Sequence, residues 1–92
     1  MATVVHNPDL SRYEIHVDGK VAGFTQYRDT PDAIDFVHTE IDDAYEGHGL
    51  GGQLARGALD QVRATGRRVI ATCPFIKGWI AKHDDYQDLL AA

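Results

Sequence analysis

Four glycines lie within six residues of the chain, in the segment Glu46-Gly47-His48-Gly49-Leu50-Gly51-Gly52. Hydrophobic residues alternate with a period of two before this segment and recur with a helical period after it, so a strand should end and a helix begin here. Glycine allows positive φ angles and lets an anion approach the backbone amides closely. The first turn of the helix adds unpaired N–H groups and a positive dipole end. The segment therefore predicts a loop that binds a phosphate or pyrophosphate, although a simple flexible turn could contain the same glycines.

The residues before this glycine loop (residues 46–52) predict an antiparallel meander. Apolar and polar side chains alternate over residues 13–17, and Asp18-Gly19 is a strong hairpin signal. Residues 20–28 form the returning arm, residues 33–41 the next strand, and residues 3–6 an expected edge strand. Simple alternation predicts that four side chains of the strand 33–41 share one face: Ile34, Phe36, His38 and Glu40.

The residues after the loop predict a helix, a strand and a second helix. Apolar residues recur four apart over residues 50–62, which is typical of an amphipathic helix, and Gly66 is a suitable C-terminal cap. An apolar strand is expected at residues 69–72, helical spacing at residues 75–83, and a further helical turn or two at residues 84–90. A helix that connects two neighbouring strands sets them parallel. The predicted fold class is therefore α+β: a mixed, mostly antiparallel sheet of about five strands with a central crossover helix and a C-terminal helix.

Length and composition limit the class of protein. The 92 residues predict one domain, residues 1–92, and a domain so small is marginally stable, which leaves a monomer or a weak homodimer open. The formal net charge of -5 argues against nucleic-acid binding. One cysteine excludes the disulfide-rich secreted class, and no apolar run reaches the ~20 residues of a membrane span, so we expect a cytoplasmic protein with no membrane partner. His6, His16 and His83 show no metal-ligand spacing, and we predict no metal site.

Two well-known phosphate loops fit the sequence poorly. A nucleotide P-loop ends in Gly-Lys-Ser/Thr, whereas this loop ends in Gly52-Gln53 and has no lysine. The dinucleotide pattern Gly-x-Gly-x-x-Gly matches Gly47, Gly49 and Gly52. That pattern should follow the first strand of a βαβ unit and precede an acidic residue about 20 positions later, whereas here a meander precedes it and the next strand ends at Cys73.

A third pattern fits better. Residues 46–51 resemble motif A of the GNAT superfamily of acetyltransferases, Gln/Arg-x-x-Gly-x-Gly/Ala, with Glu46 in the first position; its ionised side chain cannot donate to phosphate, but its backbone N–H is expected to remain available. The chain also resembles a group of minimal GNAT-like proteins that lack the first helix pair of most GNAT enzymes. That resemblance rests on Phe36-Val37-His38-Thr39-Glu40-Ile41, Thr72-Cys73-Pro74-Phe75, Trp79-Ile80-Ala81-Lys82-His83 and Tyr86. It implies a GNAT-like fold and an acetyl-CoA-dependent N-acetyltransferase that acts on a primary amine.

The resemblance also implies where acetyl-CoA binds. The pyrophosphate would lie on the glycine loop, and the pantetheine arm would run between the strand 33–41 and the strand that ends before Cys73. The implied cofactor-binding residues are Ile41, Glu46, Gly47, His48, Gly49, Leu50, Gly51, Gly52 and Cys73.

Three residues are candidates for catalysis. Glu40 is the first candidate for a general base, and His38 could relay a proton, although an exposed strand acid and a core histidine would look the same. Cys73 could be a nucleophile that forms an acetyl-enzyme or a buried residue that lines the pocket, and direct transfer is the mechanism that the superfamily favours. Tyr86 or Tyr45 could protonate the leaving thiolate.

The sequence determines neither the identity of the acceptor nor whether the protein is a catalyst. A small-molecule or lysine amine is expected as the acceptor, and Asp42 and Asp43 suit a cationic one. The alternative is a CoA-binding or interaction module without catalysis. Several cations are candidates for the 3′-phosphate of the nucleotide: Lys77, Lys82, Arg67 and Arg68.

Overall fold

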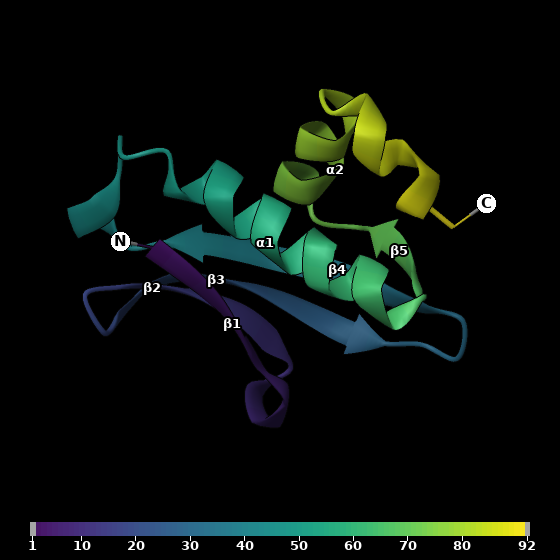
Figure 1. Cartoon of the computed structure of the whole chain (residues 1–92), viewed down its shortest axis with the longest axis horizontal. Helices are drawn as coiled ribbons and strands as arrows, with labels where there is room; N and C mark the ends of the chain where they lie inside the picture. The colour runs from purple at the N-terminus through teal and green to yellow at the C-terminus, as the bar shows by residue number, and fades with distance from the viewer. Residues whose placement is uncertain (1, 92) are drawn as a thin grey trace.

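The structure is a computed structural model of the 92-residue chain, and it describes residues 2–91. Figure 1 shows how its elements are arranged. The strands and α-helices are β1 (Ala2–Asn7), β2 (Arg12–Val17), β3 (Lys20–Asp29), β4 (Ala33–Ile41), α1 (Leu50–Thr65), β5 (Arg68–Ala71) and α2 (Pro74–Ala81). Short 3₁₀ helices span Pro8–Leu10, Asp43–Tyr45 and Asp84–Leu89. These bounds confirm the predicted elements to within one or two residues.

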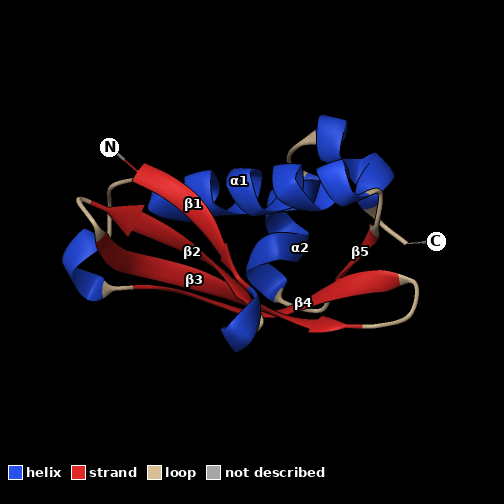
Figure 2. Ribbon diagram, turned by 60° about the horizontal axis from the view of Figure 1, so that its bottom comes forward, coloured by secondary structure: helices blue, strands red, loops and turns tan. Residues whose placement is uncertain are grey.

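The strands form one sheet in the order β1-β2-β3-β4-β5. The first four strands pair antiparallel with their neighbours, whereas β4 and β5 pair parallel across the α1 crossover. Both α-helices lie on one side of this sheet (Figure 2). We call the opposite side the helix-free face. The predicted α+β class and the predicted strand directions are confirmed.

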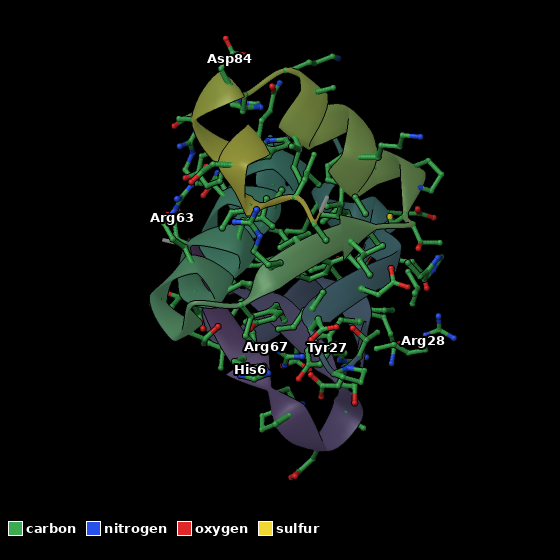
Figure 3. All side chains as sticks on the ribbon, turned by 90° about the vertical axis from the view of Figure 1, so that its right-hand side faces the viewer. His6, Tyr27, Arg28, Arg63, Arg67 and Asp84 are labelled. Carbon is green, nitrogen blue, oxygen red and sulfur yellow. The ribbon has the colours of Figure 1, made fainter. Side chains whose placement is uncertain are left out.

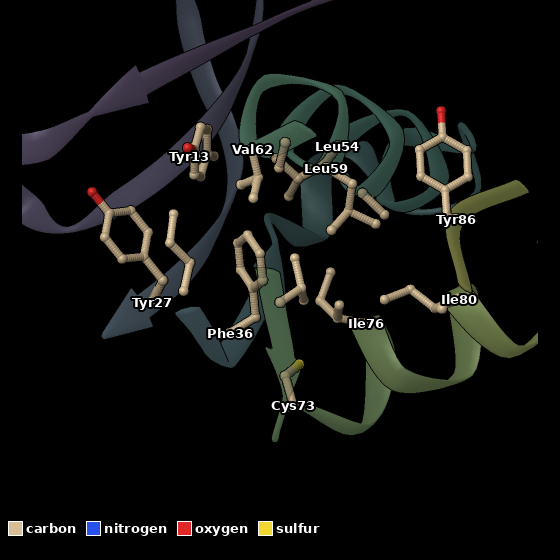
Figure 4. Close-up of a cluster of buried hydrophobic side chains, with 14 of the residues drawn as sticks. Tyr13, Tyr27, Phe36, Leu54, Leu59, Val62, Cys73, Ile76, Ile80 and Tyr86 are labelled. Carbon is tan, nitrogen blue, oxygen red and sulfur yellow. The ribbon is translucent and has the colours of Figure 1, made fainter. Parts of the chain in front are cut away.

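The hydrophobic core lies between the helices and the sheet. The buried face of α1 consists of Leu50, Leu54, Ala55, Ala58, Leu59 and Val62. It packs over Tyr13, Ile15 and Phe36 of the strands, and Ile76 and Ile80 of α2 complete the same cluster (Figure 4). Each large side chain buried in this way stabilises the fold by about 1.5–3 kcal/mol. The core therefore holds α1 across the sheet, with its first turn following the end of β4.

β4 contains a β-bulge at Val37. Phe36 lies opposite Tyr27 of β3, but His38 lies opposite the adjacent residue Gln26, so Val37 is an extra residue in β4. Because side chains of a strand alternate, one extra residue sends every later side chain to the other face.

The prediction that Phe36, His38 and Glu40 share one face is therefore wrong. Beyond the bulge, Thr39 turns to the helix side, where its hydroxyl lies 2.9 Å from the hydroxyl of the buried Thr25. His38 and Glu40 turn to the helix-free face and are exposed. Valine suits a regular strand, so the sequence carries no signal for this bulge.

The C-terminal segment covers the outer edge of β5. Leu90 forms a parallel bridge with Val69, and the Ala91 N–H donates to the Val69 carbonyl at 2.8 Å. Val69, in the middle of the four-residue strand β5, thus has a partner on both sides. Within the described part of the chain, no helix has both the length and the apolar character needed to cross a membrane.

α1 approaches the edge strand β1 most closely at Gly57. A Cβ atom on Gly57 would lie 2.5 Å from Cγ2 of Val4 and 2.7 Å from its Cβ. One turn later, the Gln61 amide donates to the Val4 carbonyl at 3.0 Å. The missing side chain at Gly57 therefore sets the distance between helix and sheet.

Glu14 is buried on the helix-free face of β2, where three side chains surround its carboxylate. The ring of His16 lies at 2.9 Å, Arg12 Nε donates at 2.8 Å, and the Asn7 amide donates at 3.0 Å. The hydrogen bond with His16, followed by those from Arg12 and Asn7, lowers the pKa of Glu14 to about 2, against the opposing effect of burial. A folded-state pKa below the unfolded value stabilises the fold above the unfolded pKa, and this stabilisation is lost as the pH falls through the folded value.

We predict that Glu14→Gln flattens the acid limb of the stability curve. Between pH 4.5 and pH 2, the free energy of unfolding of the wild type should fall more steeply than that of the variant, because only the wild type protonates this carboxylate. The difference between the two proteins should change by up to about 3 kcal/mol over the window. Urea unfolding at a series of pH values measures it, and parallel curves would contradict the role given to Glu14.

We predict opposite effects for two glycine-to-alanine substitutions in helices. Gly57→Ala should destabilise the protein by about 1–3 kcal/mol, because the new methyl group overlaps Val4. Gly78→Ala is the matched control, since a Cβ there meets nothing within 4 Å. Its higher helix propensity should stabilise the protein by about 0.5–1 kcal/mol. Chemical unfolding measures both changes, and a shift of the same sign in both variants would refute the close approach at Gly57.

Candidate functional site

The glycine loop joins β4 to α1 and presents bare backbone amides. Gly47 and Gly49 have φ angles of 82° and 72°, in the left-handed region that favours glycine. Gly49 is the N-cap residue of the 16-residue helix α1, and no described side chain hydrogen bonds to that helix start. Amides of the first turn therefore lack a side-chain acceptor, which is the condition in which a helix N-terminus binds an anion.

Gly51 and Gly52 also serve packing. A Cβ on Gly51 would lie 2.9 Å from Cζ of Phe75, and one on Gly52 would lie 3.6 Å from Nε1 of Trp79. α2 thus lies directly against the first turn of α1. This contact alone accounts for a glycine at position 51, because a larger residue would overlap Phe75. The positive φ angles of the loop are those of Gly47 and Gly49.

Two predicted cofactor-binding side chains of the loop are exposed. Glu46 ends a 3₁₀ turn, and its N–H donates to the Asp43 carbonyl at 3.3 Å, so the prediction that this N–H is available to phosphate is wrong. The His48 ring meets the edge of the Tyr45 ring with centroids 6.5 Å apart. His48 and Tyr45 together line a hollow that reaches Ala2, on the side of the loop nearest β1.

β5 pairs only with the first part of β4. The last pair of residues is Phe36 with Ala71, and the next contact is the Cys73 N–H, which donates to the Phe36 carbonyl at 2.7 Å. In the described chain no strand pairs with residues 37–41 on this side, and we call this segment the open edge. Unpaired backbone groups of a sheet edge can hydrogen bond to an extended ligand. The open edge ends one short 3₁₀ turn before the glycine loop.

Cys73 lies buried where β5 leaves β4. It is 4% exposed, and its Sγ lies 3.3 Å from Oγ1 of Thr39, which in turn contacts Thr25 at 2.9 Å. Thr39 is the hydrogen-bond partner of this thiol among residues 2–91. The sequence did not single out Thr39, because simple alternation placed its side chain on the other face.

His38 and Glu40 form a pair on the helix-free face, beside the open edge. Nε2 of His38 lies 3.0 Å from Oε2 of Glu40, and the side chains are 59% and 61% exposed. The structure thus brings these two predicted residues together. The backbone of β4 separates them from Thr39 and Cys73, which lie on the helix side.

A hollow of about 480 Å³ adjoins Glu40. Its lining residues are Arg12, Val21, Ala22, Gly23, Phe24, Glu40, Ile41, Asp42 and Asp43. The Arg12 guanidinium lies 4.5 Å from the centre of the Phe24 ring and is already paired with the buried Glu14. The carboxylates therefore determine the charge of this hollow, and it favours a cation.

The hydroxyl of Tyr86 forms its hydrogen bonds away from Cys73. It donates to Asp60 at 2.7 Å and accepts from Arg56 at 3.1 Å, and Figure 4 shows it on the far side of the core cluster from Cys73. Burial, followed by the hydrogen bond to Asp60, raises the pKa of Tyr86. The suggestion that Tyr86 protonates a thiolate near Cys73 is therefore wrong.

Arg67 and Arg68 follow the C-terminal end of α1, opposite the glycine loop. Arg67 donates to Asp29 at 2.6 Å and to two carbonyls of the β3–β4 turn at 2.8 Å. Figure 3 shows Arg67 beside Tyr27 at that end of the sheet. Both arginines are therefore excluded as ligands of a nucleotide bound at the loop.

Part of the chain is similar to a curated protein, NATD1. The protein from Bos taurus is 38% identical over 50 residues, which make up 54% of this chain and 44% of that protein. The protein from Homo sapiens is 36% identical over 50 residues, with coverage of 54% and 44%. The match thus spans less than half the length of these relatives.

Solved structures share the whole fold. An NMR structure of a GCN5-like protein from Staphylococcus aureus has a TM-score of 0.73 at 24% identity and covers 98% of this chain and 88% of that one. The crystal structure of a ribosomal-protein-alanine N-acetyltransferase from Brucella melitensis biovar Abortus has a TM-score of 0.60 at 19% identity, with coverage of 88% and 61%. At these identities the likeness shows the fold alone.

A family model matches most of the chain. The model for the GCN5-related N-acetyl-transferase matches residues 12–89. This range includes β2 to α2 and therefore the open edge, the glycine loop and Cys73. The chain belongs to the GCN5-related N-acetyltransferase family.

Proposed function

We propose that this protein binds acetyl-CoA and transfers the acetyl group to a primary amine. The observation that carries the proposal is that the glycine loop and the open edge lie next to each other in the structure. The start of α1 has no side-chain cap, the open edge next to it has no strand partner among the described residues, and Thr39 of this edge contacts Cys73. Acetyl-CoA has the matching order of parts: a pyrophosphate, an arm with two amides, and a thioester.

The residues present fit this ligand. Amides of the first turn of α1 would hold the pyrophosphate, since Gly49 caps the helix without a side-chain acceptor. Residues 37–41 would pair with the pantetheine amides in the manner of an added strand. Ile41 packs over Gly23, where a Cβ would lie 2.6 Å from Cδ1 of Ile41, and this contact keeps the end of the open edge close to β3.

Glu40 is the proposed general base. It accepts a proton from the acceptor amine, directly or through a water, and His38 at 3.0 Å orients the carboxylate and passes the proton to solvent. The amine nitrogen then forms a bond to the acetyl carbon as the carbon–sulfur bond breaks, and the CoA sulfur leaves as a thiolate that takes up the second proton released by the nitrogen as the amide forms. Positioning on the rigid sheet supplies the remaining acceleration.

Cys73 is proposed to line the thioester site rather than to form an acetyl-enzyme. A cysteine nucleophile needs a neighbouring base or another cause of thiolate formation. The partner of Cys73 is the hydroxyl of Thr39, whereas the His38–Glu40 pair lies on the opposite face of β4. This arrangement favours direct transfer.

The acceptor is proposed to be a cationic amine, either a small molecule or a lysine side chain. It would enter the hollow on the helix-free face, next to Glu40. Asp42 and Asp43 add negative charge there, while Arg12 is occupied by Glu14. Opposite charge near the site raises the local concentration of such an acceptor.

A second candidate function is CoA binding without catalysis. The specific observation in its favour is the exposure of His38 and Glu40, which are 59% and 61% exposed on a face that no α-helix covers. Water screens such groups and weakens their effect on a reaction. Turnover measurements separate the two candidates.

We predict selective binding of CoA species. Calorimetry should detect acetyl-CoA and CoA with Kd values below millimolar and should detect no comparable binding of NAD. The expected selectivity follows from the open edge, which matches the pantetheine amides that NAD lacks. Failure of both CoA species to bind below millimolar would sink the proposed function.

We predict that Glu40→Gln lowers kcat with a responsive amine by roughly 10²–10³-fold while the Kd for acetyl-CoA stays within about twofold, because removal of a general base affects the chemical step. Asp32→Asn, an exposed acid in the turn at the other end of β4, is the matched control and should keep the activity. The acceptor panel should include polyamines and lysine peptides. Acetyl-CoA binding with no turnover in the wild type would favour the non-catalytic module, and full activity of Glu40→Gln would refute its assignment.

We predict that Cys73→Ala keeps at least a tenth of the wild-type activity, because the thiol lines the site in direct transfer. Intact-mass analysis after rapid quenching with acetyl-CoA should detect no acetylated Cys73. A quenched acetyl adduct that disappears in Cys73→Ala, together with loss of turnover, would establish the acetyl-enzyme route instead.

A further inference from the structure

Thr25 is a buried polar residue to which the proposed reaction gives no role. It lies in β3, pairs across the sheet with Thr39 of β4, and is 0% exposed. Its hydroxyl lies 2.9 Å from the hydroxyl of Thr39, which in turn lies 3.3 Å from Sγ of Cys73. We call these three residues the donor cluster. A valine at position 25 would have a similar shape and would bury no polar group, so packing alone does not account for the cluster.

The burial of the donor cluster determines the direction of its hydrogen bonds. Each of the three groups carries one proton and can also accept a hydrogen bond. Among the described residues, Thr39 is the side-chain partner of both Thr25 and Cys73. Thr25 is 0% exposed and Cys73 is 4% exposed, so both groups are shielded from water. Because a buried donor without an acceptor is costly, both groups donate to the oxygen of Thr39.

The hydroxyl of Thr39 is thereby left as an outward donor. Its oxygen accepts from Thr25 and Cys73, so its own proton points away from both. Thr39 is half-buried and is the most exposed member of the donor cluster. It also belongs to the open edge, where the proposed function puts the thioester. Two hydrogen bonds from the core fix this oxygen, and such preorganisation is what makes a donor effective in catalysis.

Thr39 and Glu40 meet the open edge from opposite sides. Beyond the bulge, Thr39 lies on the helix side and Glu40 on the helix-free face. An amine activated by Glu40 would therefore attack the acetyl carbon from the helix-free face while Thr39 stays close to the thioester on the other side. During this attack the carbonyl oxygen gains negative charge. Glu40 acts on the amine and leaves this oxygen without a side-chain donor.

We propose that the hydroxyl of Thr39 donates a hydrogen bond to the carbonyl oxygen of the acetyl thioester, and that Thr25 and Cys73 hold this hydroxyl in place. The inference rests on the proposed function and deepens it, because it assigns an oxyanion donor to the same site. Thr39 is then a catalytic residue, Thr25 and Cys73 are positioning residues, and no covalent bond to the protein forms. The hydrogen bond strengthens as the carbonyl oxygen becomes the charged oxygen of the tetrahedral intermediate.

The first test removes two hydroxyls together. Thr39→Val alone would leave the Thr25 hydroxyl without an acceptor, whereas the double variant Thr25→Val/Thr39→Val replaces both partners by apolar groups of similar shape and should fold. The double variant should lower kcat roughly 10²-fold and keep the Kd for acetyl-CoA within about threefold. Thr39→Ser keeps the hydroxyl, and its kcat should stay within about threefold of the wild type.

Thr72→Val is the matched control. It removes a hydroxyl one residue before Cys73 that donates to Asp35 at 2.7 Å instead of joining the donor cluster, so it should keep kcat. Wild-type kcat in the double variant would overturn the assignment of Thr39. An equal loss of kcat in Thr39→Ser or in Thr72→Val would overturn it as well.

The second test observes the acetyl carbonyl directly and needs no acceptor. Acetyl-CoA labelled with ¹³C at this carbonyl should show its stretching band at lower frequency when bound to the wild type or Thr39→Ser than when bound to the double variant, because a hydrogen bond weakens the C=O bond. Equal frequencies in the bound wild type and double variant would refute the hydrogen bond and leave the proposed function intact. Failure of acetyl-CoA to bind below millimolar would instead remove the proposed function, and this inference with it.

The third test probes the direction of the donor cluster without a ligand. The chain has one cysteine, so its one S–H stretching band reports on Cys73. If the thiol donates to Thr39, this band should lie at lower frequency in the wild type than in the double variant, where the acceptor is absent. Equal frequencies would show that the thiol does not donate to Thr39 and would overturn the outward direction of the Thr39 hydroxyl.

Discussion

The site depends on the short parallel pairing between β4 and β5. Four residues of β5 pair with the beginning of β4, and the pairing ends at Phe36 and Ala71. The chain then turns at Cys73-Pro74 into α2, because proline favours the first turn of a helix and cannot continue the ladder. Among the described residues, the remainder of β4 has no strand partner on this side, next to the start of α1. The same connection thus produces the open edge and, next to it, a helix start without a side-chain cap.

The bulge at Val37 determines which side chains of β4 lie on each face of the sheet. Before it, the strand contributes Phe36 to the core; after it, Thr39 faces Cys73 on the helix side, while His38 and Glu40 face outward. One inserted residue therefore places Thr39 and the His38–Glu40 pair on opposite faces of a single strand. Under the proposed function, the thioester would lie at the open edge between the two faces, where an acceptor on the helix-free face would meet both the thioester and Glu40.

The sequence predicted the elements, their order and their directions, because alternation, helical spacing and turn residues are local signals. It also predicted the loop, and with it the family. The sequence-based predictions were wrong or incomplete where contacts between separate segments determine a residue's position or partner. The faces of β4 depend on a register shift against β3, the N–H of Glu46 is taken by Asp43, and Gly51 is needed for Phe75 of another helix. The predicted proximity of Glu40 and His38 held, because both lie beyond the bulge and the strand alternates regularly between them.

The most direct test of the account is the map of amide chemical shifts on titration with acetyl-CoA. If the glycine loop and the open edge form the cofactor site, the largest changes should fall on residues 37–41 and on the start of α1, with the Cys73 amide close behind. Residues of the edge strand β1 should serve as the internal control and change little. The account would be contradicted if saturation with acetyl-CoA changed the amide chemical shifts of β1 or of the β3–β4 turn and left those of residues 37–41 and 47–53 unchanged.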